Sequence, residues 1–178
     1  GNVYITGTFN GTVDFDLGAG EFLMTAHLPY AESCPQAQDL FILKLNASGD
    51  FVWAGQVGGN GRERSRAIAL TAEENVVVAG EYASEGNFPV DLDPTEGTNY
   101  VTATSGAAAF IIKLDPDGAF IWGEQWYSSG LSAGGCGLRD ALVHPFSLCT
   151  DGTGSIFCTG DFGSTVDFDP NQGVYSIG

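Results

Sequence analysis

Val13-Asp14-Phe15-Asp16 is the stretch that decides the fold, because the same pattern occurs three times along the chain. The other two copies are Val90-Asp91-Leu92-Asp93-Pro94 and Val166-Asp167-Phe168-Asp169-Pro170. Glycines follow each copy, at Gly18 and Gly20, at Gly97 and at Gly173. A motif that returns at a regular spacing indicates a repeat protein, in which each copy belongs to one structural unit.

Two other segments recur around the acidic motif. Residues 2–7 match 75–80 and 155–160, and residues 41–53 match 110–122. Each unit then carries four short runs rich in Val, Ile, Phe, Tyr and Trp, which predict β-strands. We label them by their expected order in a unit: A at 65–71 and 144–150; B at 2–9, 75–82 and 155–162; C at 39–46 and 109–115; D at 51–58 and 119–127.

The connections between the strands are of two kinds. Tight turns are predicted between C and D, where Asn46 and Asp115 start the turn and Gly49 and Gly118 take a positive φ. Tight turns are also predicted between A and B. The long connections are B–C, which holds the acidic motif, and D–A, which is rich in Gly and Ser.

Antiparallel four-stranded units that repeat without helices between them predict an all-β fold, an open fragment of a β-propeller. Residues 1–64 would form a partial blade with strands B, C and D, residues 65–143 a full blade, and residues 144–178 the start of a third blade. A closed propeller has at least four blades, so this segment does not close by itself. A stacked array of β-sheet repeats is the alternative.

The residues also resemble a known family. Gly-Asn-Val-Tyr-Ile-Thr-Gly at 1–7, Val-Asp-Phe-Asp at 13–16 and the strand-turn-strand segment 41–53 look like the SBBP-type beta-propeller repeats of secreted bacterial proteins. The resemblance covers nearly the whole chain. It implies an extracellular or cell-surface multi-blade propeller without catalytic residues. The third unit departs from the pattern where His144-Pro145-Phe146 replaces the apolar alternation of strand A.

Composition excludes several classes of function. The net charge is −16, from 22 acidic and 6 basic residues, so the chain lacks the basic patches that bind nucleic acid or anionic membranes. No apolar run reaches the length of about 20 residues that a membrane helix needs, so we expect no membrane insertion. The chain opens on a turn and a strand rather than on a signal peptide, and we expect it to be a piece of a longer protein.

The acidic motif has two interpretations, which the sequence leaves open. In an extended chain two carboxylates at i and i+2 point to one side, and together with turn carbonyls they suit Ca²⁺. The predicted calcium ligands are Asp14, Asp16, Asp91, Asp93, Asp167 and Asp169. Asp before Pro and Gly is equally typical of a structural turn, in which the carboxylate accepts backbone N–H groups. The motif also lacks the distal bidentate Glu of an EF-hand.

The remaining polar residues give weaker hypotheses. His27 and His144 are the two histidines, but no Gly-x-Ser-x-Gly elbow or paired nucleophile accompanies them, so we expect no enzyme. The basic cluster at 62–66 predicts salt bridges between blades, with capture of a carboxylate ligand as the alternative. The B–C and D–A connections leave a propeller on one face. On that face a glycan could contact His27, Arg62, Trp126 and Tyr127.

Four cysteines leave the question of disulfides open. None lies in a Cys-x-x-Cys pair, so zinc is disfavoured. Cys34 and Cys136 are both expected in long loops of one face and could bridge blades. Cys149 and Cys158 lie on neighbouring strands, at positions poorly placed for a disulfide.

The sequence therefore predicts a non-enzymatic, calcium-stabilised extracellular segment that serves as a scaffold, adhesion or assembly module. Its partners would be further blades or other copies of the chain, because both ends of the segment are open. The alternative is a carbohydrate-binding or carbohydrate-active protein that uses the B–C/D–A face.

Overall fold

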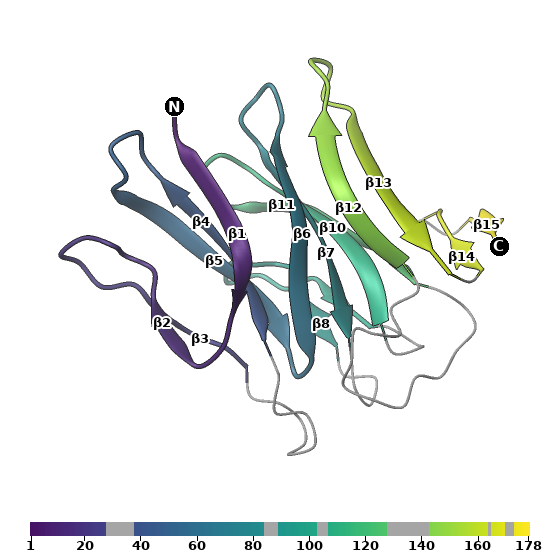
Figure 1. The fold of residues 1–178 in the computed structure, drawn as a ribbon, viewed down its shortest axis with the longest axis horizontal. Coiled ribbons are helices and arrows are strands. Elements are labelled where there is room, and N and C mark those ends of the chain that lie inside the picture. The colour runs from purple at the N-terminus through teal and green to yellow at the C-terminus, as the bar shows by residue number, and fades with distance from the viewer. Residues whose placement is uncertain (28–37, 84–88, 103–106, 128–142, 164, 170–172) are drawn as a thin grey trace.

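The computed structural model describes residues 1–27, 38–83, 89–102, 107–127, 143–163, 165–169 and 173–178, and all of their regular elements are β-strands (Figure 1). The long strands are β1 (Val3–Phe9), β4 (Asp39–Leu45), β5 (Phe51–Gly59), β6 (Arg62–Leu70), β7 (Val76–Ala83), β10 (Ala107–Leu114), β11 (Phe120–Tyr127), β12 (Val143–Thr150) and β13 (Ile156–Phe162). The short ones form three small hairpins: β2 (Thr12–Asp14) with β3 (Leu23–Thr25), β8 (Val90–Asp91) with β9 (Tyr100–Val101), and β14 (Val166–Asp167) with β15 (Ser176–Ile177).

The long strands form three antiparallel sheets, which confirms the predicted fold class. The middle sheet has the order β11-β10-β7-β6, which is a four-stranded blade with strands D, C, B and A. The first sheet contains β1, β4 and β5 as strands B, C and D, and β12 pairs with β13 as strands A and B of a third. Gly49 and Gly118 have φ of 88° in the two C–D turns, as their sequence context predicts.

The sheets pack face to face. The A strand of the second blade, β6, lies between a strand of the first blade and a strand of the third. Strand β6 contacts both β1 and β12, and these three strands lie side by side in Figure 1. The A–B and C–D turns lie at the top of that view, whereas the D–A turn between β5 and β6 lies at the opposite end. The sequence predicts this division of the connections between two faces.

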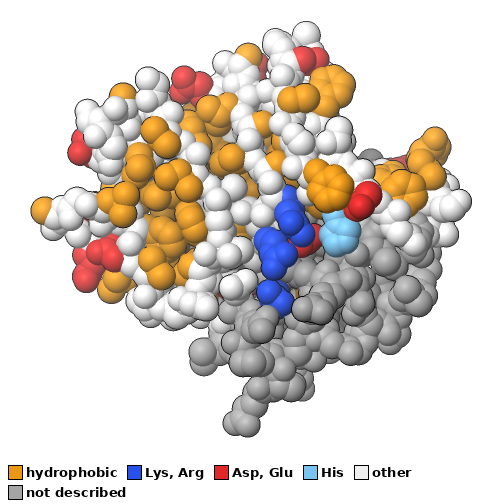
Figure 2. Space-filling model, viewed as in Figure 1, with side chains coloured by type: hydrophobic (Ala, Val, Ile, Leu, Met, Phe, Trp, Pro, Cys, Tyr) orange, Lys and Arg blue, Asp and Glu red, His pale blue; other side chains and the backbone are white. Residues whose placement is uncertain are grey.

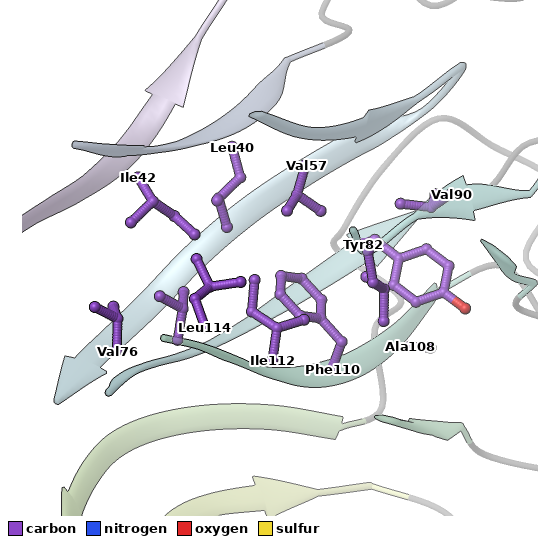
Figure 3. Close-up of a cluster of buried hydrophobic side chains, with 12 residues drawn as sticks. Leu40, Ile42, Val57, Val76, Tyr82, Val90, Ala108, Phe110, Ile112 and Leu114 are labelled. Atoms are coloured by element: carbon purple, nitrogen blue, oxygen red, sulfur yellow. The ribbon is translucent and has the colours of Figure 1, made fainter. Parts of the chain in front are cut away.

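The main hydrophobic core fills the space between the first two sheets. Leu40, Ile42 and Val57 project from the first blade toward Val76, Val78, Tyr82, Phe110 and Ile112 of the second (Figure 3). All of these side chains are fully buried. Alternate residues of β4 face this core, while Phe41, Leu43 and Leu45 belong to a second cluster on the outer side of the first sheet. Strand β4 is therefore apolar on both faces, as a strand between two layers must be.

The A strand of the third blade begins at Val143, and its register differs from the one that the sequence suggests. Sequence similarity aligns residues 67–72 with 145–150. In the structure Ser65 and Pro145 are the equivalent residues, because each pairs with the central glycine of its B strand, Gly80 or Gly160. A bulge follows at the same place in both strands, so it does not cause the difference. The equivalent residues are 80 positions apart, which is also the spacing between Gly80 and Gly160.

That central glycine of strand B is covered by an aromatic ring from strand C. Gly7 pairs with Phe41, and Gly80 pairs with Phe110. A Cβ at Gly7 would lie 2.7 Å from Cε1 of Phe41, and a Cβ at Gly80 would lie 2.5 Å from Cζ of Phe110. Both distances are too short for a real Cβ, so glycine leaves the space that the ring occupies. At Gly80 the backbone oxygen of Arg64, which lies even closer to the same position, excludes a Cβ as well.

We therefore expect Gly80→Ala to destabilise the chain by about 2–3 kcal/mol, as overpacking of a core does. Denaturation in urea measures this change. Gly152→Ala is the control, because a Cβ at Gly152 meets no atom within 4 Å, and its effect should stay within about 0.5 kcal/mol. Equal stability of the Gly80→Ala variant and the wild type would contradict the close packing of Phe110.

Candidate functional site

Each acidic motif forms a small hairpin that its first aspartate closes. Oδ1 of Asp91 accepts hydrogen bonds from the backbone N–H of Asp93 at 3.0 Å and of Asn99 at 2.8 Å. Asp14 accepts from Asp16 and Phe22 in the same way, and Asp167 accepts from Asp169 and Tyr175. The acceptor therefore binds residues i+2 and i+8 in all three copies. These are the turn hydrogen bonds that the structural interpretation of the motif predicts.

The second aspartate of each motif lies against the glycine four residues later. Asp16 accepts the backbone N–H of Gly18, and Asp93 accepts both the N–H and the hydroxyl of Thr95. A Cβ on the later glycine would collide with Oδ2 of the second aspartate in every copy; these glycines are Gly20, Gly97 and Gly173. The recurrence of glycine after the motif is thus explained by a carboxylate that occupies the space of its side chain.

The second hairpin joins two blades. Asp91 pairs with Gly58 and Val90 pairs with Gly59, so β8 extends the first sheet beyond β5 although it belongs to the second blade. Val90 and Leu92 are buried in the core between the blades. The third hairpin lies near the second blade, since β14 contacts β11, but among the described residues these two strands are not paired. The sequence identifies the motif as a repeated loop, but it gives no signal that the loop pairs with the preceding blade.

The six predicted calcium ligands are thus placed in three separate hairpins. Among the described residues, no group of three or more Asp, Glu, His or Cys side chains has an arrangement that could hold a metal ion. Calcium binding by these aspartates stays a prediction.

A polar cleft of about 630 Å³ opens beside the joint of the first two blades. It is lined by His27, Gln56, Asn60 and Tyr100 and by the carboxylates of Asp91 and Asp93. Tyr100 is 64% exposed. The second acidic hairpin therefore has two roles in the structure, because it joins the blades and also forms one wall of this cleft.

His27 and Gln56 reach the cleft because a buried carboxylate holds them. Oδ2 of Asp39, which is fully buried, accepts hydrogen bonds from the backbone N–H of His27 at 3.0 Å and from the Gln56 amide, and it lies 2.6 Å from Nδ1 of His27. The hydrogen bond to Asp39 raises the pKa of His27, and the charges of Asp39 and Asp91 act in the same direction, while burial opposes them. Sequence analysis placed His27 at this face but missed Asp39, which lies within an apolar strand pattern.

A second buried carboxyl group lies near Asp39. Glu63 on β6 is fully buried, and neither oxygen of its carboxyl group has a hydrogen-bond partner. Burial raises the pKa of Glu63 well above its usual value, and the nearby charge of Asp39 raises it further, while the backbone N–H of Gly59, which is near but outside hydrogen-bond geometry, opposes them. The neutral, protonated form is thus the one that this environment favours.

The basic cluster forms a network around a third buried acid, Glu81 on β7. Arg66 Nη2 lies 2.6 Å and Arg64 Nη1 3.6 Å from Oε1 of Glu81, and His144 Nδ1 lies 2.8 Å from its Oε2. His144 comes from β12, so Glu81 connects the second blade with the third. Figure 2 shows these basic side chains gathered in one group beside the histidine. The two arginines therefore pair with Glu81 within the second blade, and in this network only His144 reaches across to another blade. The salt bridges that the sequence predicts between blades are thus not formed by Arg64 and Arg66.

Among the residues predicted to bind a glycan, Trp126 lies in the seam between the second and third blades. It is partly buried against Val143, Val166 and Phe168, and it also lines a cavity of about 410 Å³ at this seam. Tyr127 ends β11, whereas Arg62 begins β6 beside its pairing partner Ala83.

The cysteine predictions have different outcomes. Cys34 and Cys136 lie outside the described residues. Cys149 and Cys158 are free and exposed. A pairing of Thr150 with Ser155, expected from the sequence, would place Cys149 opposite Ile156. In the structure Cys149 pairs with Phe157 and Cys158 pairs with Leu148, a register that differs by one position. Because side chains alternate between the faces of a sheet, the two thiols point to opposite sides, and they form no disulfide.

Comparisons with known proteins agree with the fold. No family model matches the chain, so membership in the SBBP family is not confirmed. The chain is 27% identical over 141 residues to an uncharacterized WD repeat-containing protein of Acanthamoeba polyphaga mimivirus. The match covers 74% of this chain and 9% of that protein, so the chain spans less than a tenth of this relative. The match supports a repeat of the β-propeller type. No helix in the described part of the chain is long and apolar enough to span a membrane.

Glu63 should make the stability of the chain depend on pH. Its pKa is raised in the folded state, so the folded chain keeps this proton at a pH where the unfolded chain, with a pKa of about 4.3, has lost it. Stability from this group is therefore greatest at low pH and decreases as the pH rises toward the folded pKa. We expect Glu63→Gln, which mimics the neutral acid, to remove this decrease.

Urea unfolding between pH 4 and pH 8 measures the effect. Glu96→Gln, at an exposed position, changes the net charge equally and should leave the decrease intact. His27 gives a decrease of the same sign above its unfolded pKa of about 6.5, because its folded pKa is also raised. Below pH 6 the pH dependence of the unfolding free energy therefore reports Glu63 rather than His27. If this free energy changed with pH equally in the Glu63→Gln and Glu96→Gln variants, the assignment would be contradicted.

Proposed function

We propose that this chain is a non-enzymatic segment of a β-propeller-type protein and serves as a scaffold for interactions. The observation that carries the proposal is the joint between blades, in which a hairpin of one blade pairs with strand D of the blade before it. The same hairpin recurs in all three units with the same hydrogen bonds. The most regular feature of the chain thus serves assembly, whereas an active site needs one asymmetric set of residues.

Both ends of the segment offer apolar surface for further assembly. The outer side of the first blade exposes Val3, Ile5, Leu17, Leu23 and Val52, and Figure 2 shows hydrophobic side chains gathered in a broad patch over this part of the molecule. At the other end, the third blade exposes Phe146, Phe157, Val174, Tyr175 and Ile177. Apolar patches of this kind mark interaction surfaces. Further blades of the same type are the partners that we propose.

We also propose an extracellular or cell-surface location and a role in adhesion. Both rest on the resemblance to secreted repeats. Glycan binding is the alternative function. The polar cleft with its exposed Tyr100 supports the alternative better than Trp126 does, because Trp126 is partly buried in the seam between two blades. A glycan array is the direct measurement.

Calcium stabilisation of the acidic hairpins is a separate proposal, supported by the two carboxylates that each hairpin presents. We expect the melting temperature to be higher in calcium than in a chelator, and we expect Asp93→Asn to reduce this difference. Calorimetry measures both effects. Equal melting temperatures of the wild type in calcium and in chelator would remove the proposal and leave the hairpins as structures held by hydrogen bonds.

Assembly through the open ends predicts that the 178-residue chain associates in a concentration-dependent way. Sedimentation velocity over a range of concentrations measures the association. Ile5→Lys together with Leu23→Lys places charges on the outer side of the first blade and should weaken the association. Lysines at Ala47 and Ala72, in two exposed turns, add the same charge and are the control. A monodisperse monomer at all concentrations would contradict the assembly function.

A further inference from the structure

The third blade ends in an open strand edge. Among the described residues, β13 pairs only with β12, whereas its counterpart β7 lies between β6 and β10. The exposure of equivalent residues differs accordingly. Val78 and Tyr82 on β7 are fully buried, but their counterparts Cys158 and Phe162 are exposed. The edge of β13 that corresponds to the β10 side of β7 is therefore unpaired in this part of the chain.

In the first two blades a ring from strand C completes a small cluster at this edge. In the first blade Phe41 lies 4.9 Å from Phe15 and 6.4 Å from Phe9, measured between ring centroids. In the second blade Phe110 lies at the same 6.4 Å from Tyr82, which is the counterpart of Phe9. Each of these rings also covers the central glycine of strand B. The same arrangement thus occurs twice, at corresponding positions.

The third blade contains two members of this cluster and the glycine. Phe162 and Phe168 correspond to Phe9 and Phe15, and their rings are 5.3 Å apart, compared with 5.2 Å in the first blade. Gly160 corresponds to Gly7 and Gly80. A cavity of about 410 Å³ lies at the place that the third ring takes in the other blades, and it is lined by Gly160, Phe162, Phe168 and Trp126, among others.

We propose that this edge binds an antiparallel strand C that places a phenylalanine ring opposite Gly160. The ring fills the cavity between Trp126 of the second blade and Phe162 and Phe168 of the third. The strand has the pattern Phe-Ile-x-Lys-Leu, which is shared by residues 41–45 and 110–114. This inference rests on the proposed propeller function, and it adds the identity, register and anchoring side chain of the partner strand.

The occupant is a strand outside these 178 residues rather than β4 or β10 of another copy. Both strands are central in their sheets, since β4 pairs with β1 and β5, and β10 pairs with β7 and β11. A second copy could donate either one only by breaking two strand pairings and exposing the main core. A further segment of the same repeat type has no such cost.

A fusion tests the proposal in the correct register. Val101 and Ile177 occupy the same position in their hairpins, so Gly178 corresponds to Thr102. A second copy of residues 103–127 placed directly after Gly178 therefore supplies strands C and D to the third blade. The variant carries F110A in the appended copy only. The control carries I121A in the appended copy, because Ile121 is exposed on strand D.

Thiol labelling of Cys158, resolved by mass spectrometry of its peptide, is the measurement. Cys158 is free and exposed, and its counterpart Val78 is fully buried beside strand C. We expect the fusion and its I121A control to label Cys158 at least tenfold more slowly than the 178-residue chain does. The F110A fusion should recover most of the original rate. Cys149, on the opposite face of the hairpin, is the internal reference.

Two results would overturn the proposal. Equal labelling rates of Cys158 in the fusion and in the 178-residue chain would show that no strand binds there. Equally slow labelling with and without the ring would show that Phe does not anchor the strand. Hydrogen exchange along β13 separates strand binding from local unfolding, since binding slows exchange and unfolding accelerates it. The result is independent of the sedimentation experiment, because it does not depend on whether the open ends associate between copies.

Discussion

The structure depends on one shared hydrophobic layer, the core between the first two sheets. Neither sheet can bury its apolar face alone, because Leu40, Ile42 and Val57 come from one blade while Val78, Phe110 and Ile112 come from the next. The acidic hairpin fixes this layer at its edge, since β8 pairs with the end of β5 and brings Val90 and Leu92 into the same core. Hydrogen bonds to Asp91 keep the hairpin closed, and a closed hairpin keeps those two side chains in place.

Buried charges mark the seams between blades. Asp39 holds His27 and Gln56 at the cleft between the first two blades, and Glu81 binds Arg64, Arg66 and His144 where the second blade meets the third. A buried carboxylate is costly without partners, so each one requires its neighbours to keep their positions. Glu63 avoids the cost of a buried charge in another way, because its raised pKa favours the neutral carboxylic acid. These groups make the relative placement of adjacent blades specific as well as stable.

Much of the fold could be predicted from the sequence, and the misses have identifiable causes. The strands follow from short runs of β-branched and aromatic residues, and the C–D turns follow from Asn46 and Gly49 or Asp115 and Gly118. The register of β12 was predicted wrongly, because the alignment of residues 67–72 with 145–150 does not keep the spacing of 80 residues that separates Gly80 from Gly160. Asp39 and Glu63 were missed for a related reason. A single acid within a strand looks like a solvent-facing position, and only the neighbouring sheet buries it.

By itself the sequence determined the repeat, the strand types, the antiparallel all-β class and the turn chemistry of the acidic motif. All of these depend on contacts between residues that are close along the chain or on a pattern that recurs. The tertiary structure alone decided that the second motif pairs with the preceding blade, that Trp126 is partly buried in a seam, and that Cys149 and Cys158 point to opposite faces. These features depend on which surfaces meet when one sheet packs on another. No local pattern records that choice, because burial is a property of the assembled layers.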